Sequence, residues 1–201
     1  MSAQKSLARV WPVVGAFLCG LVLVFGAIVY IAGRSSSPIG PAIAAVGGPF
    51  HLEDENGKPV SDADMKGRPF LVFFGFTHCP DICPTTLFDM SQVLHTLGPD
   101  AGRIGVLFIT VDPERDTPAV LKDYLSNFDP HLRGLTGDPA AVNAALKAFR
   151  VYAKKVPLEG SDYTMDHTAV VCLMDKNGRF VAPFNMKRTA EAEVADLRGY
   201  L

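Results

Sequence analysis

The chain has 201 residues, 48% of them hydrophobic, and its 19 basic and 21 acidic side chains give a formal net charge of −2. Three basic residues, Lys5, Arg9 and Arg34, precede every acidic one, so the part after residue 34 is acidic overall. That part has no stripe of basic residues, which argues against a nucleic-acid partner.

The most apolar segment covers residues 10–33, which contain no charged side chain and have Trp11 and Tyr30 near their ends. These 24 residues exceed the roughly 20 that a helix needs to cross a bilayer, so we expect a transmembrane anchor here. A cleaved signal peptide is the alternative, because Ala42-Ile43-Ala44 has the small-x-small form of a cleavage site. However, the apolar core of a signal peptide is shorter, at roughly 7–15 residues.

The basic residues near the N-terminus predict the orientation of this anchor. Lys5 and Arg9 precede the apolar run, so the positive-inside rule favours a cytoplasmic segment at residues 1–9. A linker at residues 34–44 follows, and residues 45–201 are long enough for one exported domain with a buried core. Because nine residues without a transit-peptide composition precede the run, we favour the bacterial inner (cytoplasmic) membrane, with the domain in the periplasm, over the mitochondrial inner membrane.

The exported domain shows apolar runs that alternate with segments of helical period. Thr117-Pro118 and Asp138-Pro139 have the cap-then-proline pattern of helix starts. Strands that alternate with helices, followed by a terminal hairpin and helix, predict an α/β sheet with flanking helices on both faces. The expected strands cover residues 50–60 (a hairpin with an Asn-Gly turn), 70–76, 103–111, 168–174 and 179–184, and the expected helices cover 84–97, 117–128, 138–149 and 190–200.

The most informative motif joins the expected strand 70–76 to the expected helix 84–97. Cys79 and Cys83 are separated by three residues, and Pro84 suits the first helical position, which makes Cys83 the predicted N-cap. The backbone N–H groups and dipole at a helix N-terminus favour thiolates. A cysteine loop in this place predicts a thioredoxin-like fold. Thioredoxins have two intervening residues, and the third makes room for an ion between the sulfurs while still permitting a disulfide.

A third ligand would complete a site for a soft metal ion. Thiolates select Cu(I), Zn(II) or iron–sulfur clusters, and Cu(I) accepts two or three ligands. Clusters held by four cysteines are excluded, because the domain has only Cys79, Cys83 and Cys172. We expect His167 as the third ligand, since the loop before the expected strand 168–174 lies against the cysteine loop in thioredoxin-like folds.

The other soft or imidazole side chains are expected to have structural or surface roles. His78 is adjacent to Cys79, and neighbouring side chains rarely bind one ion. Met165 is considered as a fourth soft ligand, although a loop methionine more often packs. Cys172 lies in an apolar strand and is predicted to be a buried, inert thiol. The remaining histidines, expected at surface or helix positions, are His51, His95 and His131.

Three segments in this order resemble the Sco/SenC family: residues 75–84, residues 111–118 and Asp166-His167-Thr168. The resemblance extends from about Gly48 to the C-terminus, and the predicted anchor also resembles that family. It implies a thioredoxin-like, membrane-tethered copper protein needed to assemble the dinuclear copper centre of cytochrome c oxidase. The implied ligands of one copper ion per monomer, as Cu(I) and also as Cu(II), are Cys79, Cys83 and His167.

The resemblance implies a copper metallochaperone rather than an enzyme. Copper would come from a donor protein and pass by ligand exchange to the copper-site subunit of cytochrome c oxidase. The alternative is a thiol–disulfide oxidoreductase that uses Cys79 and Cys83 to reduce the cysteines of that centre, and a redox or copper sensor is a third hypothesis. For Asp112 and Asp116 in the second segment we expect structural roles at a strand end and a helix start.

Overall fold

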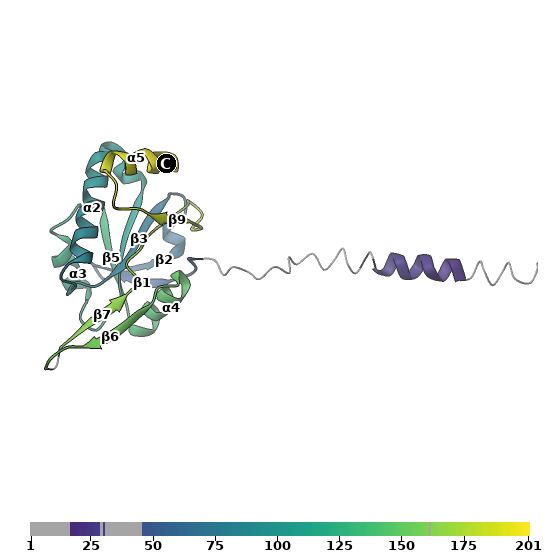
Figure 1. The fold of residues 1–201 in the computed structure, drawn as a ribbon, viewed down its shortest axis with the longest axis horizontal. Helices are drawn as coiled ribbons and strands as arrows, with labels where there is room; N and C mark the ends of the chain where they lie inside the picture. Colours follow the sequence, from purple (N-terminus) through teal and green to yellow (C-terminus); the bar gives the residue numbers. More distant parts are fainter. Residues whose placement is uncertain (1–16, 29, 31–45, 161) are drawn as a thin grey trace, which may run out of the picture. The chain divides into compact units, whose positions relative to one another are not determined.

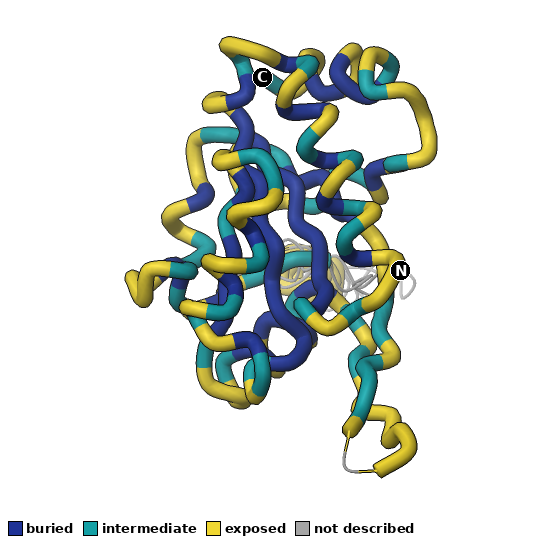
Figure 2. Tube along the Cα trace, turned by 90° about the vertical axis from the view of Figure 1, so that its left-hand side faces the viewer, coloured by how far each residue is buried: buried dark blue, intermediate teal, exposed yellow. Residues whose placement is uncertain are grey.

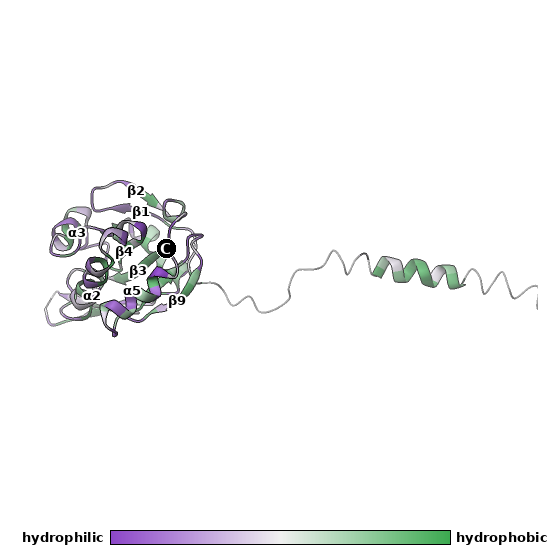
Figure 3. Cartoon of the chain, turned by 90° about the horizontal axis from the view of Figure 1, so that it is seen from above, coloured by the Kyte–Doolittle hydropathy of each residue, from purple (hydrophilic) through white to green (hydrophobic). Residues whose placement is uncertain are grey.

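The computed structural model describes residues 17–28, 30, 46–160 and 162–201 (Figure 1). The chain divides into two units, Met1–Ile43 and Ala44–Leu201, and each is treated by itself. In the first unit, residues 17–28 and 30 are helical, and Figure 3 colours most of this helix as hydrophobic. No helix among the described residues combines the length and the hydropathy that a membrane span requires. The predicted segments 1–9 and 34–44 and the rest of 10–33 lie outside the described residues, so the anchor remains a prediction.

The second unit contains a seven-stranded mixed sheet with the order β2-β1-β5-β4-β3-β8-β9. The three inner strands β5, β4 and β3 are parallel, and the strands outside them pair antiparallel. Every residue of β3 and β4 is buried, as expected for central strands of a covered sheet, and Figure 2 shows buried (dark blue) segments through the middle of the domain. The strands are β1 (His51–Asp54), β2 (Pro59–Ser61), β3 (Phe70–Gly75), β4 (Gly105–Thr110), β5 (Leu132–Thr136), β8 (Val171–Met174) and β9 (Phe180–Phe184).

Helices cover both faces of the sheet. Successive side chains of a strand point to opposite faces. Phe74 of β3 packs against Phe149, with ring centroids 5.3 Å apart, whereas Phe73 packs against Phe108, whose ring meets that of Tyr124. Since Phe149 belongs to α4 and Tyr124 to α3, these two helices lie on opposite faces, and the predicted α/β architecture is confirmed. The helices are α2 (Ile82–Leu97), α3 (Pro118–Leu125), α4 (Pro139–Phe149), α5 (Ala190–Arg198) and the short 3-10 helices η1 (Asp62–Met65) and η2 (Gly98–Arg103).

The helix starts show which predicted caps form. Thr117 and Asp138 are confirmed as N-caps, because their side-chain oxygens accept the backbone N–H of Val120 and Ala141. The N-cap predicted at Cys83 is wrong. Helix α2 begins at Ile82, with Asp81 as its N-cap, so Cys83 lies inside the first turn.

Three strands lie where the sequence pattern predicts none. One is β5, an inner strand of the sheet, and the others are β6 (Ala153–Pro157) and β7 (Tyr163–His167). The last two form a separate antiparallel sheet, a hairpin that projects from the domain in Figure 1. Most residues of β6 are exposed, so this strand lacks the alternation of apolar and polar residues that reveals a half-buried strand. His167 is therefore the last residue of a strand, which the sequence did not predict.

Candidate metal centre

The candidate metal centre lies where the parallel strands β3 and β4 end. Residues 76–81 follow β3, and residues 111–117 follow β4. The backbone N–H of Val111 donates to the carbonyl oxygen of Gly75 at 2.8 Å, which holds the two loops together. In α/β sheets, ligands bind at this carboxyl edge of the strands.

The three predicted ligands come together at this edge. Their donor atoms (the sulfurs of Cys79 and Cys83 and a ring nitrogen of His167) all lie within 4.8 Å of one another. Cys83 Sγ is 3.8 Å from His167 Nε2, and the backbone N–H of Cys83 donates to Cys79 Sγ at 3.4 Å. Metal–ligand bonds of about 2.0–2.3 Å, as for zinc, place donors of one ion roughly 4 Å apart. Two thiols and an imidazole with this spacing fit a soft metal ion such as Cu(I).

The metal-free protonation states of the two buried donors follow from their surroundings. Cys83 is 0% exposed, and burial raises the pKa of its thiol strongly, so the thiolate predicted from the helix N-terminus is wrong for this cysteine. Burial lowers the pKa of His167, whose imidazole is therefore neutral at pH 7. Its Nδ1–H donates to the carbonyl oxygen of Thr168 at 3.2 Å, which leaves the Nε2 lone pair facing the Cys83 thiol, 3.8 Å away. Metal binding must accordingly release the Cys83 proton.

Two neighbouring residues at the end of β3 shape the space around these donors. A Cβ atom on Gly75 would lie 2.8 Å from Cys83 Sγ and 2.7 Å from a ring carbon of Phe108. The ring of Phe76 meets the His167 ring edge to face, with centroids 5.7 Å apart. Gly75 therefore leaves room for the buried sulfur, and Phe76 supports the imidazole.

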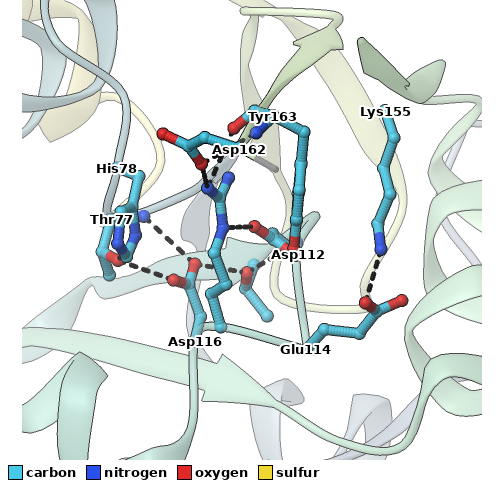
Figure 4. A network of polar contacts seen from close by, with 10 residues as sticks. Thr77, His78, Asp112, Glu114, Asp116, Lys155, Asp162 and Tyr163 are labelled. Atoms are coloured by element: carbon cyan, nitrogen blue, oxygen red, sulfur yellow. Dashed lines mark hydrogen bonds and ion pairs between the residues drawn. The ribbon is translucent and has the colours of Figure 1, made fainter. Parts of the chain in front are cut away.

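Asp116 ties the cysteine loop to the loop that follows β4 (Figure 4). Its buried carboxylate accepts the backbone N–H and the hydroxyl of Thr77 at 3.1 and 2.6 Å, and the Thr110 hydroxyl at 2.6 Å. Burial raises the pKa of Asp116 despite these three hydrogen bonds. Thr77 lies two residues before Cys79, so Asp116 anchors the start of the cysteine loop.

Asp112 joins the same loop to the β6–β7 hairpin. Its carboxylate accepts the Tyr163 hydroxyl at 2.8 Å and Arg115 Nε at 2.5 Å. Arg115 also donates to the carbonyl oxygen of Tyr163 at 2.9 Å, and its guanidinium lies 3.8 Å from the centre of the Tyr163 ring. The sequence did not single out Tyr163. With β7 recognised as a strand, the period of two would have placed Tyr163 on the same face as His167.

Among the described residues, the other histidines and Cys172 lie outside the cluster of donors. His78 is exposed, and its ring bonds the Thr77 hydroxyl instead. Cys172 is buried in β8, and burial raises the pKa of its thiol, as expected for an inert packing residue. Met165 is half-buried and packs against the core. The other histidines, all exposed, are His51, His95 and His131.

Comparisons with known proteins identify the family. A sequence model of the SCO1/SenC family matches residues 40–201. A SCO2-like protein of Rickettsia prowazekii is 40% identical over 154 residues, which cover 76% of this chain and 75% of that protein. The mitochondrial SCO1 protein of Saccharomyces cerevisiae is 46% identical over 140 residues, which cover 68% of this chain but only 48% of the yeast protein.

Solved structures share the fold as well as the sequence. The copper-bound structure of ScoI from Bradyrhizobium japonicum is 61% identical, with a TM-score of 0.77 over 78% of this chain and 100% of that one. The copper-bound structure of yeast Sco1 is 41% identical, with a TM-score of 0.69 over 78% of this chain and 91% of that one. The chain therefore belongs to the SCO1/SenC family, because the family model matches residues 40–201 and these relatives share its sequence and fold.

Proposed function

We propose that this chain binds one copper ion through Cys79, Cys83 and His167 and delivers it to the copper-site subunit of cytochrome c oxidase. The observation that carries the proposal is the convergence of two sulfurs and one imidazole nitrogen within 4.8 Å. Two relatives with the same fold, at 61% and 41% identity, have been solved with copper bound. Another relative, at 27% identity, is described as a member of the Sco family of cytochrome c oxidase assembly proteins.

The three donors differ in how they can take up and give up the ion. Cys83 is fully buried, Cys79 is half-buried, and His167 belongs to the projecting hairpin. On copper binding, each cysteine would bind as a thiolate and His167 through its Nε2 lone pair. For delivery, a thiolate of the acceptor replaces one donor at a time, and each released cysteine sulfur regains a proton. Copper changes ligands in this exchange, and no electron needs to move.

The proposal includes the predicted anchor at residues 10–33 in a bacterial inner membrane, with residues 45–201 in the periplasm and a separate protein as copper donor. Its support is the uncharged run of the sequence and the basic residues Lys5 and Arg9 before it. An anchor would hold the copper-binding domain close to a membrane-embedded acceptor and so raise its effective concentration there.

A second candidate function is thiol–disulfide exchange by Cys79 and Cys83. A relative at 27% identity and a TM-score of 0.63 is described as having a disulfide switch, and the two sulfurs here lie within 4.8 Å. In such a reaction the two thiols become a disulfide, and their two electrons and two protons convert a disulfide of the target to two thiols. The imidazole of His167 has no part in that balance, which separates the two functions.

The first test is a Cu(I) titration of the reduced full-length chain in detergent, in competition with a chromophoric Cu(I) chelator. We expect the wild-type chain to bind one ion tightly. The affinity for Cu(I) should be at least about tenfold weaker in His167→Ala, and the double variant Cys79→Ser, Cys83→Ser should show no tight binding. His78→Ala is the matched control, because His78 is a neighbouring histidine outside the cluster, and it should bind copper like the wild type.

The outcomes separate the two functions. Unchanged copper affinity in His167→Ala would contradict the three-ligand site. A second outcome would favour thiol–disulfide exchange. In it, the wild-type chain binds no copper, and the wild type and His167→Ala reduce a disulfide-bonded acceptor peptide at the same rate. Copper transfer to a reduced two-cysteine acceptor, lost in Cys79→Ser and in Cys83→Ser, is the result that delivery requires.

A further inference from the structure

The β6–β7 hairpin carries His167, yet no strand of the main sheet pairs with it among the described residues. At its base, the N–H of Thr168 donates to the carbonyl oxygen of Tyr152, and the N–H of Tyr152 donates to the Thr168 hydroxyl. Both bonds join the two arms of the hairpin to each other. Backbone pairing therefore shapes the hairpin but does not set its angle to the sheet, and side-chain contacts must do so.

One group of side-chain contacts is well placed to set this angle. It consists of Asp112, Arg115 and Tyr163, which we call the clasp (Figure 4 labels the first and the last of these). The Asp112 side chain is fully buried, and that of Arg115 is 17% exposed. The second loop-to-hairpin contact, between Glu114 and Lys155, joins side chains that are 59% and 43% exposed. Exposed ion pairs contribute little, whereas a buried carboxylate that loses a partner is costly.

The clasp connects both halves of the candidate metal centre. Tyr163 and His167 lie at the two ends of β7, about 13 Å apart along the strand at 3.3 Å per residue. A contact that fixes Tyr163 therefore fixes the tilt of the strand that presents the imidazole. Asp116, four residues after Asp112, holds Thr77 at the start of the cysteine loop. The short loop that follows β4 therefore contacts the cysteine loop through Asp116 and the β6–β7 hairpin, which carries His167, through Asp112.

The chemistry of the clasp gives it a defined geometry. Burial and the hydrogen bond to Asp112 raise the pKa of Tyr163, so its hydroxyl stays protonated and donates. Arg115 contacts Asp112, the Tyr163 carbonyl oxygen and Asp162 at once, with its plane over the Tyr163 ring. A planar guanidinium can make these contacts together, which the ammonium of a lysine cannot.

We infer that Tyr163 is a positioning residue for the third copper ligand: its hydroxyl, held by Asp112 and Arg115, keeps the His167 imidazole within reach of Cys79 and Cys83. The inference rests on the proposed copper function. When the clasp is closed, three donors face one ion. When it is open, the hairpin is held only by contacts such as those of Met165 with the core and of Phe76 with His167, so the clasp sets how firmly the third ligand is presented to copper.

The test uses Tyr163→Phe, which removes the hydroxyl but keeps the ring. Cu(I) affinity is measured for this variant, for His167→Ala and for the double variant. We expect Tyr163→Phe to weaken copper binding about tenfold in the wild-type background and to have no effect in the His167→Ala background. Glu114→Gln is the matched control, since it breaks the exposed contact between the same loop and the same hairpin, and it should bind copper like the wild type.

A second measurement needs no copper. In the metal-free protein, the ring current of Phe76, whose centroid lies 5.7 Å from that of His167, should shift the NMR signals of the His167 ring protons. We expect Tyr163→Phe, but not Glu114→Gln, to move these shifts toward those of an unpacked histidine. Urea denaturation checks that each variant is folded. If Tyr163→Phe does not fold, Arg115→Lys takes its place and should show the same pattern.

Two results would overturn the inference. One is a Tyr163→Phe variant with wild-type His167 shifts and wild-type copper affinity. The other is an equal loss of affinity in both backgrounds, because the hydroxyl would then act without His167. If the wild-type chain binds no copper, the proposed function fails, and the metal-free spectrum alone decides whether the clasp positions His167.

Discussion

At the scale of single residues, Gly75 has the clearest effect on the candidate metal centre. It ends the central strand β3, and the space of its missing side chain is occupied by Cys83 Sγ and the ring of Phe108. Since both neighbours are fully buried, neither can move aside without disturbing the core. Because Gly75 has no side chain, the core packs closely there and the sulfur of Cys83 can lie beside the end of β3.

We predict that Gly75→Ala destabilises the protein by about 1–3 kcal/mol, the usual cost of overpacking a core, and also weakens copper binding. The added methyl group must displace either the ring or the sulfur. Urea denaturation and Cu(I) competition measure the two effects. Gly102→Ala is the control, because a Cβ atom there meets nothing within 4 Å. If Gly75→Ala were as stable as Gly102→Ala, the core around Gly75 would have to accommodate a methyl group without cost, which would contradict the prediction.

At the scale of elements, helix α5 carries a buried acid where it packs on α2. Glu193 is 1% exposed, and its Oε1 has no hydrogen-bond partner among the described residues. Burial raises the pKa of Glu193, and the nearby charge of Asp89 on α2 adds to the rise, against opposing contributions from Arg188. The contact between the two helices is therefore strongest when Glu193 is protonated.

We predict that this contact makes stability depend on pH. The pKa of Glu193 is higher in the folded state than its unfolded value of 4.5, so the folded state binds the proton more tightly. Its contribution to stability is complete below that unfolded value and is lost as the pH rises through the folded pKa. Glu193→Gln should remove this loss, so the variant gains stability relative to the wild type as the pH rises above 4.5.

Urea midpoints at several pH values measure the effect. Glu191→Gln, a change at an exposed residue of the same helix, is the control and should follow the wild type. Parallel pH profiles for the wild type and Glu193→Gln would mean that Glu193 has no part in the pH dependence.

At the scale of the whole molecule, the transmembrane anchor expected at residues 10–33 remains a prediction from the sequence. We expect the full-length chain, expressed in a bacterium, to stay in the membrane pellet after a carbonate wash. Leu21→Arg combined with Phe25→Arg should release it, because each arginine at the centre of a span costs about 2.5–3.5 kcal/mol on insertion. Leu21→Ala combined with Phe25→Ala is the control and should remain in the pellet. Extraction of the wild-type chain by carbonate would contradict the anchor.

Elements that depend on local interactions were predicted from the sequence, whereas strands without a local signal were missed. Helix α4 and the β1–β2 hairpin were predicted because a cap at Asp138 and an Asn-Gly turn with Gly57 at φ 75° are local signals. Strand β5 was missed because it is short and contains Arg133 and Gly134. Hairpin β6–β7 was missed because none of its strand residues is fully buried. Neither segment shows the apolar pattern on which strand prediction depends.

By itself, the sequence determined the donor types, the Cys79–Cys83 spacing and the order of most strands and helices, since these depend on residues close together in the chain. Only the tertiary structure brought His167 to Cys83 across 84 residues and Tyr163 to Asp112 across 51. It also decided the surroundings of Cys83, whose burial raises the pKa of its thiol and so opposes the thiolate. Such contacts depend on which strands pair and which side chains lose water, and no local pattern of residues carries that information.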